Sequence, residues 1–334
     1  MKIILVVFIL ISFFFLRFFP GFGSSKKLVL AHNNPQGHPV HRGLVDFSTK
    51  LNDLSLGKYE VKVYPSEILG REREVLELIQ VGALDFTKVS SSNLENFSPL
   101  WAVINLPYIF ESTSHYFEVL DGEVGQTLLN VLQKNKMQGL AFYDAGARSF
   151  YASKPILSPQ DIEGLKIRVM GSQSAIRMLK AMGGSPTPMP YGEVYTALQQ
   201  NVIDGAENNV FALTTKKHGE VVKHYSLDEH AMMPDVLVMS AKLWHVLDLE
   251  ERKWVKEAAL YSQGQQRKYW AEEIYKEMQK IENELGMKVH HPKKAPFIKK
   301  VESLHQELAS QGPKFRILIE KIKSLMNSAK DENL

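Results

Sequence analysis

The chain has 334 residues, of which 44% are hydrophobic, and it contains 40 Lys and Arg, 37 Asp and Glu, and no cysteine. This length allows roughly two domains of ~150 residues, each able to bury a core, and the mixed composition argues against disorder, collagen and coiled coil. The absence of cysteine excludes disulfide scaffolds, thiol nucleophiles, Cys-ligated zinc and a lipid-modified cysteine anchor.

The N-terminal segment has the pattern of a secretory signal peptide. Lys2 is followed by an apolar run over 3–16 and then by small residues up to Ser25. A run this short suits the h-region of a signal, whereas a bilayer-spanning helix needs ~20 apolar residues. We therefore expect residues 1–25 to be a signal peptide cleaved after Gly23 or Ser25, with an uncleaved anchor as the alternative.

The formal charge of +3 comes mostly from that segment. Lys2 and Arg17 are its only charged residues, so 38 basic and 37 acidic residues leave the mature chain at +1. A nearly neutral protein is not expected to bind nucleic acid or an anionic membrane through bulk charge. No later stretch of the sequence is apolar enough to span a bilayer, so we expect a soluble protein in the periplasm.

Hydrophobic periodicity predicts an α/β chain in two series of elements. The first series alternates strands with helices, which favours an open, largely parallel sheet. Its predicted strands are 27–31, 59–64, 84–89 and 139–143. Its predicted helices are one that runs through Phe47 and ends at Leu54, one at 71–81 and one at 113–133. The second series has predicted strands at 165–169 and 235–239 and predicted helices at 174–182 and 193–200. The late apolar strand at 235–239 could return to the first sheet.

One predicted helix is unusually long. Residues 249–285 contain no proline and end at Gly286, the residue type that commonly follows a helix C-terminus. At a rise of 1.5 Å per residue the helix is roughly 55 Å long, more than the width of one ordinary domain. Its apolar stripe changes face midway, which indicates either a break near Gly264 or one helix that serves two domains.

Two arginines are the first candidates for binding an acidic ligand. Arg168 lies near the C-terminal end of the predicted strand at 165–169, and Arg148 lies in a predicted glycine-containing turn after the strand at 139–143. In open α/β sheets ligands bind beyond the carboxyl ends of strands, and a guanidinium matches a carboxylate with two parallel hydrogen bonds. A solvated arginine in a salt bridge is the alternative for each.

Two further residues could complete such a site. Tyr191 lies beside a predicted helix start and could stack on a ring-shaped ligand, or simply cap the helix. Asn208 follows a predicted strand and carries a donor and an acceptor suited to hydroxyl groups, although loop asparagines are more often turn formers.

Other chemistries lack their motifs. His38 and His41 are three residues apart, but no HExxH pattern accompanies them, so we expect no metal site. The sequence contains no GxSxG, no GxGxxG after a strand and no P-loop, and no convincing nucleophile–base pair. We therefore expect no cofactor and no enzymatic activity.

Taken together, these residues resemble one family, the extracytoplasmic solute-binding proteins of TRAP transporters of the DctP type. The matching segments are 63–65 with 69–70, 85–87, 106–108, 164–169, 186–189, 193–199 and 202–208. The resemblance implies an α/β, two-domain periplasmic binding protein fold with mixed sheets, a cleft between the domains and a long helix spanning both. The domains expected from it are 26–145 plus 234–273, and 146–233 plus 274–330.

The resemblance also implies roles for individual residues. Arg168 matches the arginine that pairs with the substrate carboxylate, Arg148 a second basic cleft residue, Asn208 a ligand-contacting asparagine and Tyr191 a cleft aromatic. In the first domain, Asn33 and Glu72 fall where some members place polar ligand contacts. Ser90 stands where sialic-acid binders have an acidic residue, which speaks against sialic acid.

The implied function is capture of a carboxylate-bearing organic anion for a TRAP-type secondary transporter. The segments 146–151, 226–230 and 234–235 look like members that bind sugar acids such as hexuronates, while C4-dicarboxylates stay open. The expected partners are the small acid and the membrane subunits of the DctQ and DctM type, and the protein is expected to be a monomer. A ligand-binding partner of a sensor and a periplasmic enzyme are the remaining alternatives.

Overall fold

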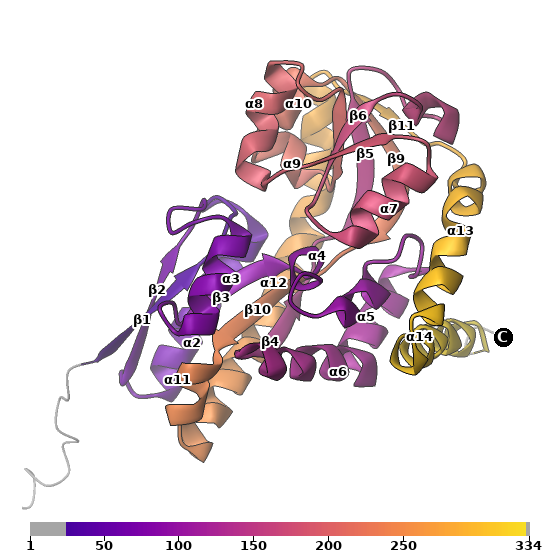
Figure 1. Ribbon diagram of the computed structural model, residues 1–334. Helices are drawn as coiled ribbons and strands as arrows, with labels where there is room; N and C mark the ends of the chain where they lie inside the picture. Colours follow the sequence, from indigo (N-terminus) through magenta and orange to yellow (C-terminus); the bar gives the residue numbers. More distant parts are fainter. Residues whose placement is uncertain (1–24, 332–334) are drawn as a thin grey trace, which may run out of the picture.

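The structure is a computed structural model that describes residues 25–331. The predicted signal peptide lies outside the described residues, apart from Ser25. The described chain forms two α/β lobes, each built on its own mixed sheet (Figure 1). The predicted fold class, an α/β fold of two domains with mixed sheets, is confirmed.

The first lobe contains a sheet in the order β2-β1-β3-β10-β4. Its strands are β1 (Lys26–Ala31), β2 (Tyr59–Tyr64), β3 (Phe86–Ser90), β4 (Met137–Tyr143) and β10 (Asp235–Ser240). Strands β2, β1 and β3 run parallel, but β10 inserts antiparallel between β3 and β4. Because β4 is antiparallel to β10, it runs in the same direction as β2, β1 and β3, and β10 is the one antiparallel strand of the five. The expectation of a largely parallel sheet is therefore confirmed for this lobe, and so is the return of the late apolar strand to the first sheet.

Helices cover both faces of this sheet. They are α2 (Pro39–Leu54), α3 (Glu72–Val81), α4 (Ser91–Leu94), α5 (Thr113–Asp121), α6 (Glu123–Val131) and α11 (Ala241–Val246), with short 3₁₀ turns at Pro99–Ile104 and Leu132–Asn135. The predicted single helix over 113–133 is wrong, because Gly122 adopts an extended conformation (ψ −163°) and separates α5 from α6. Glycine is a poor helix former, so the chain breaks there at low cost.

The second lobe contains a sheet in the order β11-β9-β5-β8-β6-β7. Its strands are β5 (Ala147–Ala152), β6 (Lys166–Val169), β7 (Ser185–Pro188), β8 (Gly205–Asn208), β9 (His224–Met232) and β11 (Lys288–His290). Its helices are α7 (Gln173–Ala181), α8 (Val194–Gln199), α9 (Phe211–Thr214) and α10 (His218–Val221), with 3₁₀ turns at Pro159–Ile162 and Tyr191–Glu193. Arg148 lies within β5, so its predicted placement in a turn is wrong.

The long helix α12 (Leu249–Asn283) is continuous and contacts both lobes. The carboxylate of Asp248 accepts a hydrogen bond from the Glu251 N–H, and the Glu251 carboxylate accepts one from the Asp248 N–H, so the helix starts with a capping box. It packs on α2 and β4 of the first lobe and on α9 of the second, as Figure 1 shows. Of the two predicted explanations for its changing apolar face, one helix serving two domains is therefore the correct one.

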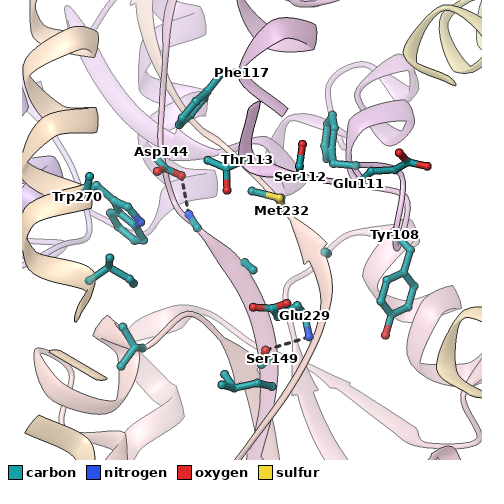
Figure 2. Close-up of a pocket in the computed structure, with 18 of the residues that line it drawn as sticks. Tyr108, Glu111, Ser112, Thr113, Phe117, Asp144, Ser149, Glu229, Met232 and Trp270 are labelled. Atoms are coloured by element: carbon teal, nitrogen blue, oxygen red, sulfur yellow. Dashed lines mark hydrogen bonds between the residues drawn. The ribbon is translucent and has the colours of Figure 1, made fainter. Parts of the chain in front are cut away.

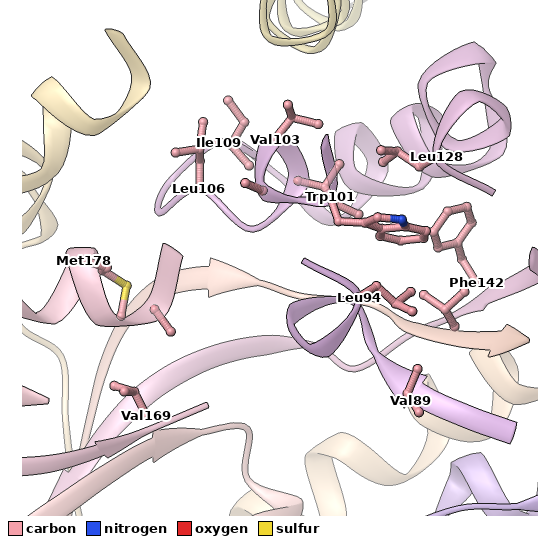
Figure 3. Close-up of a cluster of buried hydrophobic side chains, with 14 of the residues drawn as sticks. Val89, Leu94, Trp101, Val103, Leu106, Ile109, Leu128, Phe142, Val169 and Met178 are labelled. Carbon is pink, nitrogen blue, oxygen red and sulfur yellow. The ribbon is translucent and has the colours of Figure 1, made fainter. Parts of the chain in front are cut away.

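The largest hydrophobic cluster is continuous between the lobes. In the first lobe Trp101 packs against Phe142, with ring centroids 6.0 Å apart, and the cluster reaches Val169 and Met178 of the second lobe (Figure 3). Burial of apolar area on this scale is the main stabilising term of the fold.

The last two helices of the described chain are α13 (Lys294–Ser310) and α14 (Pro313–Asp331). Helix α13 contacts β9 and α7 of the second lobe, but α14 contacts α5 and α6 of the first. All strands fall within the segments expected for their domains, and the division itself stays a proposal. The contacts of α14 favour moving 313–331 into the first domain.

Candidate functional site

All seven residues singled out from the sequence line one small pocket between the lobes. Its cavity volume is about 50 Å³, and its polar lining comes from both sheets. The lining residues are Asn33, Asn34, His38, Glu72, Lys88, Ser90, Ala145, Arg148, Arg168, Met170, Tyr191, Asn208, Asn209, Met233, Asp235 and Trp270. Residues more than 170 positions apart in the sequence are therefore neighbours here.

The topology of the two sheets explains this convergence. Ser90 and Asn208 are the last residues of β3 and β8, and Arg168 is the penultimate residue of β6. Arg148 and Asp235 lie at the beginnings of β5 and β10, which run antiparallel to β8 and β3 and so start at the same edges. The site occupies the carboxyl edges of the parallel strands, where α/β sheets bind ligands.

Arg168 is buried without an acidic partner. Its side chain is 3% exposed, and Nε and Nη2 both donate to the carbonyl oxygen of Met189, at 3.1 and 2.9 Å. No carboxylate among the described residues forms an ion pair with it. Burial, with a contribution from the charge of Arg148, lowers the pKa of this guanidinium. A buried cation of this kind is costly and calls for an anion in the pocket.

Arg148, in contrast, is already neutralised. Its Nε and Nη2 donate to the two carboxylate oxygens of Glu207 at 2.6 and 3.0 Å, and Nη1 donates to Oδ1 of Asn208 at 2.7 Å. Burial alone would raise the pKa of Glu207, but Arg148 and His230 outweigh it and hold that pKa at about 2. Arg148 therefore orders the pocket more than it adds net charge to it.

Tyr191 and Asn208 present free polar atoms beside these arginines. The Tyr191 ring lies 5.8 Å from the Arg168 guanidinium and 5.1 Å from Nζ of Lys216, so cations flank the aromatic face. No described residue bonds the Tyr191 hydroxyl. The Oδ1 atom of Asn208 accepts from Arg148 and from the Asn209 N–H, which leaves its amide N–H₂ group as a donor.

In the first lobe, Glu72 and Ser90 are linked to each other. Glu72 is the first residue of α3, and its carboxylate accepts hydrogen bonds from the Ser90 backbone N–H at 3.1 Å and from the Asn93 amide. Burial raises the pKa of Glu72 to about 7, although the charge of Lys88 opposes this shift. The Ser90 hydroxyl accepts from the Ser92 N–H at the start of α4.

Lys88 is a site residue that the sequence analysis missed. It is 1% exposed, and its ammonium lies 2.6 Å from Oδ1 of Asn33 and 3.0 Å from Oδ2 of Asp235. The available signal was a lysine within the otherwise uncharged stretch Phe86–Ser90, which indicates a cation in a buried strand. Asp235 was noted only as part of a subgroup pattern.

A larger cavity lies next to the connections between the lobes. Its volume is about 550 Å³, and its lining includes Asp144 and Gly146 of the connection between β4 and β5. Trp270 lines both this cavity and the small pocket, and Figure 2 shows it facing the same cavity as Asp144. Both cations of its lining are already in ion pairs, Arg267 with Asp121 and Lys294 with Glu229. The smaller pocket, with its unpaired guanidinium, is the better candidate for an acidic ligand.

Gly146 explains how the connection between β4 and β5 passes so close to helix α12. It has a left-handed backbone (φ +61°), and a Cβ atom there would lie 2.8 Å from the Trp270 ring. Gln266 of the same helix holds the connection by accepting from the Asp144 N–H at 2.8 Å and donating to the Asp144 carbonyl at 2.9 Å.

Residues 25–331 contain no cluster of three or more His, Asp or Glu side chains arranged to hold a metal ion. Within the same residues, no helix is both long enough and apolar enough to cross a bilayer.

Two α/β lobes, a helix that spans both, and a buried polar pocket with an unpaired arginine between them define a two-lobed solute-binding protein. The model of the bacterial extracellular solute-binding proteins, family 7 (DctP), matches residues 30–311, and the chain belongs to this family. The resemblance found in the sequence is thereby confirmed.

Relatives agree over nearly the whole chain. A TRAP periplasmic solute-binding protein from Anaerococcus prevotii, solved with bound D-glucuronate, is 37% identical, with a TM-score of 0.89 over 91% of this chain and 99% of that one. A second, from Xanthobacter autotrophicus and solved with β-D-galacturonate, is 38% identical, with a TM-score of 0.86 over 89% of this chain and 99% of that one. The uncharacterized protein YiiZ of Salmonella typhimurium is 38% identical over 93% of this chain and 95% of its own length.

Proposed function

We propose that this protein binds a hexuronate, such as D-glucuronate or D-galacturonate, in the small pocket between its lobes. The observation that carries the proposal is Arg168, a buried guanidinium that faces the pocket without an acidic partner. A ligand carboxylate would complete the ion pair through the donors that Met189 leaves unused. The bound sugar acids of the similar solved proteins support this ligand class.

The remaining pocket atoms suit the hydroxyl groups of a sugar. Tyr191 offers its hydroxyl and Asn208 its amide N–H₂ from the second lobe, while Glu72, Asn33 and Ser90 face them from the first. A pocket that bonds hydroxyl groups rejects ligands without them, because its buried polar atoms are then left unpaired.

Capture would couple to closure of the lobes. Contacts between the lobes include Nζ of Lys216 donating to the Asn33 carbonyl at 2.8 Å and the ion pair of Arg71 with Glu193 at 2.5 Å. A ligand that touches both lobes adds to these contacts in the closed form and shifts the population toward it. Entry to a pocket this small needs the lobes to part.

The same proposal places the protein in the periplasm, as a monomer that delivers its ligand to TRAP membrane subunits of the DctQ and DctM type. It binds no nucleic acid and releases its ligand chemically unchanged, so it is not an enzyme. The pocket supports this view, since none of its groups forms a nucleophile–base pair among the described residues.

Calorimetry and thermal denaturation with D-glucuronate, D-galacturonate and D-glucose test the proposal. A ligand at a concentration of 100 Kd stabilises the folded state by about 2.7 kcal/mol, so both uronates should raise the melting temperature by several degrees. Glucose lacks the carboxylate and should have no effect. Binding of glucose equal to that of glucuronate, or no binding of either uronate, would refute it.

A further inference from the structure

The ammonium group of Lys88 is fully occupied by first-lobe oxygens. It lies 2.6 Å from Oδ1 of Asn33, 3.0 Å from Oδ2 of Asp235 and 3.4 Å from Oδ1 of Asn34, and a longer ion pair of 3.8 Å joins it to Oε1 of Glu72. An ammonium has three N–H donors, and the three acceptors within hydrogen-bond distance match that number. Lys88 therefore holds the acceptors in place and has no donor left for a ligand carboxylate.

Asp235 lines the pocket and has one carboxylate oxygen, Oδ1, without a hydrogen-bond partner among the described residues. It starts β10, where it pairs with Ser90 of β3 on one side and with Tyr143 of β4 on the other, so its backbone is held in the middle of the sheet. Its side chain lines the pocket, and among the described residues only Lys88, at Oδ2, contacts its carboxylate. An ionised carboxylate only accepts hydrogen bonds, so Oδ1 calls for a hydroxyl donor on the ligand.

The two walls of the pocket consequently offer a ligand different groups, a guanidinium in the second lobe and carboxyl groups in the first. In the second lobe Glu207 neutralises Arg148, and Arg168 remains positive. In the first lobe the single ammonium of Lys88 faces the two carboxyl groups of Glu72 and Asp235. A ligand with a carboxylate at one end and hydroxyl groups at the other matches this polarity, whereas a second carboxylate would face like charge.

We propose that Asp235, positioned by Lys88, is the specificity-determining residue that makes this pocket select polyhydroxy monocarboxylates and reject dicarboxylates. The inference rests on the proposed function, because it assumes that Arg168 holds the ligand carboxylate. It adds that the first-lobe wall, opposite Arg168, determines which carboxylic acids bind.

The experiment compares D-glucuronate, D-glucarate and succinate by calorimetry on the full mature protein. Glucarate is a hydroxylated six-carbon acid with a second carboxylate, and succinate has two carboxylates and no hydroxyl group. Like-charge contacts across an interface cost several kcal/mol, so wild type should bind glucarate and succinate at least about 100-fold more weakly than glucuronate. In D235N this preference for glucuronate should fall by about tenfold or more.

Matched variants separate this effect from a general loss of structure. Asp85→Asn makes the same change in a half-buried aspartate that caps the Val29 N–H away from the pocket, and it should leave the preference unchanged. If D235N does not fold, Glu72→Gln is used instead, because it removes the other first-lobe carboxyl group. This variant must likewise reduce the ratio by which glucuronate binds more tightly than glucarate and succinate.

The outcomes distinguish the two proposals. If wild type fails to bind any hexuronate, the proposed function is wrong. If wild type binds glucuronate and succinate equally, or if D235N weakens all three acids by one factor, the hexuronate function stands and Asp235 is not the selector.

Discussion

Replacing Arg168 by Met tests whether one buried charge carries ligand binding. Arg168 is 3% exposed, and its guanidinium bonds the Met189 carbonyl but no carboxylate among the described residues, so the variant removes a cation whose proposed anion is the ligand. Loss of one member of a buried, hydrogen-bonded charge pair costs about 2–5 kcal/mol. Since 1.4 kcal/mol is tenfold in Kd, D-glucuronate should bind roughly 30- to 4000-fold more weakly.

The same substitution should have little effect on the free protein. The substitution removes only two hydrogen bonds, both from the Arg168 guanidinium to the Met189 carbonyl, and burial already disfavours the charged form of that guanidinium. The net worth of an ordinary hydrogen bond is about 1 kcal/mol, so the free energy of unfolding without ligand should change by about that much or less. A polar side chain that served only the fold would show the opposite pattern, with stability lost and ligand affinity kept.

The assay is urea denaturation with and without glucuronate, together with calorimetry. Arg177→Met is the control, because Arg177 is an exposed cation on α7 of the same lobe and removes the same formal charge. It should keep wild-type affinity, since a screened surface charge contributes little. If Arg168→Met binds glucuronate within threefold of wild type, or if the two variants weaken binding equally, a placed charge is not the basis of binding.

Three further changes have defined outcomes. The pKa of Glu72 is raised to about 7, so the folded protein holds a proton that the unfolded chain releases near pH 4.5, and stability falls as pH rises between these values. Urea titrations of wild type and Glu72→Gln test this: from pH 4.5 to 7, wild type should lose about 3 kcal/mol of unfolding free energy relative to the variant. Parallel pH profiles of the two proteins would contradict this expectation. Gly146→Ala places a methyl group 2.8 Å from the Trp270 ring in a left-handed backbone and should cost about 1–3 kcal/mol of stability, measured by the same titrations. Gly264→Ala, at a position in α12 where a Cβ atom meets nothing within 4 Å, should instead stabilise by about 1 kcal/mol, and a loss there would mean that the helix is strained at this point.

Much of the secondary structure follows from local signals. The period-2 alternation of Tyr59–Tyr64 predicts β2 with its observed bounds, and the long proline-free segment predicts α12 to within two residues at its C-terminus. Local signals fail where contacts with segments distant in the sequence decide the conformation of a residue. Arg148 lies two residues after Gly146 and looks like a turn residue, but it pairs with Ala231 of β9, and from Ser149 onward β5 also pairs with β8.

The candidate site shows the same division. Arg168 could be named from its place at the end of a strand, because the carboxyl edge of a sheet is where ligands bind. The uncharged neighbours of Lys88 indicate a buried strand, but they do not show which groups its ammonium meets, so its place in the site does not follow from the sequence. Its burial depends on β10, which lies antiparallel beside β3 and contributes Asp235 from almost 150 residues further along the chain.

The sequence by itself determined the element types, the two-lobed organisation, the family and the residue types of the pocket, because periodicity, helix caps and motif spacing are properties of short segments. Only the tertiary structure decided which charges are free. Arg148 and Arg168 are alike in the sequence, yet the pairing of β5 with β8 brings Glu207 to Arg148, while no carboxylate within residues 25–331 pairs with Arg168. Because the strength of a charge depends on what lies within a few ångströms of it, the distinction between a structural and a ligand-binding arginine arises only when the chain is folded.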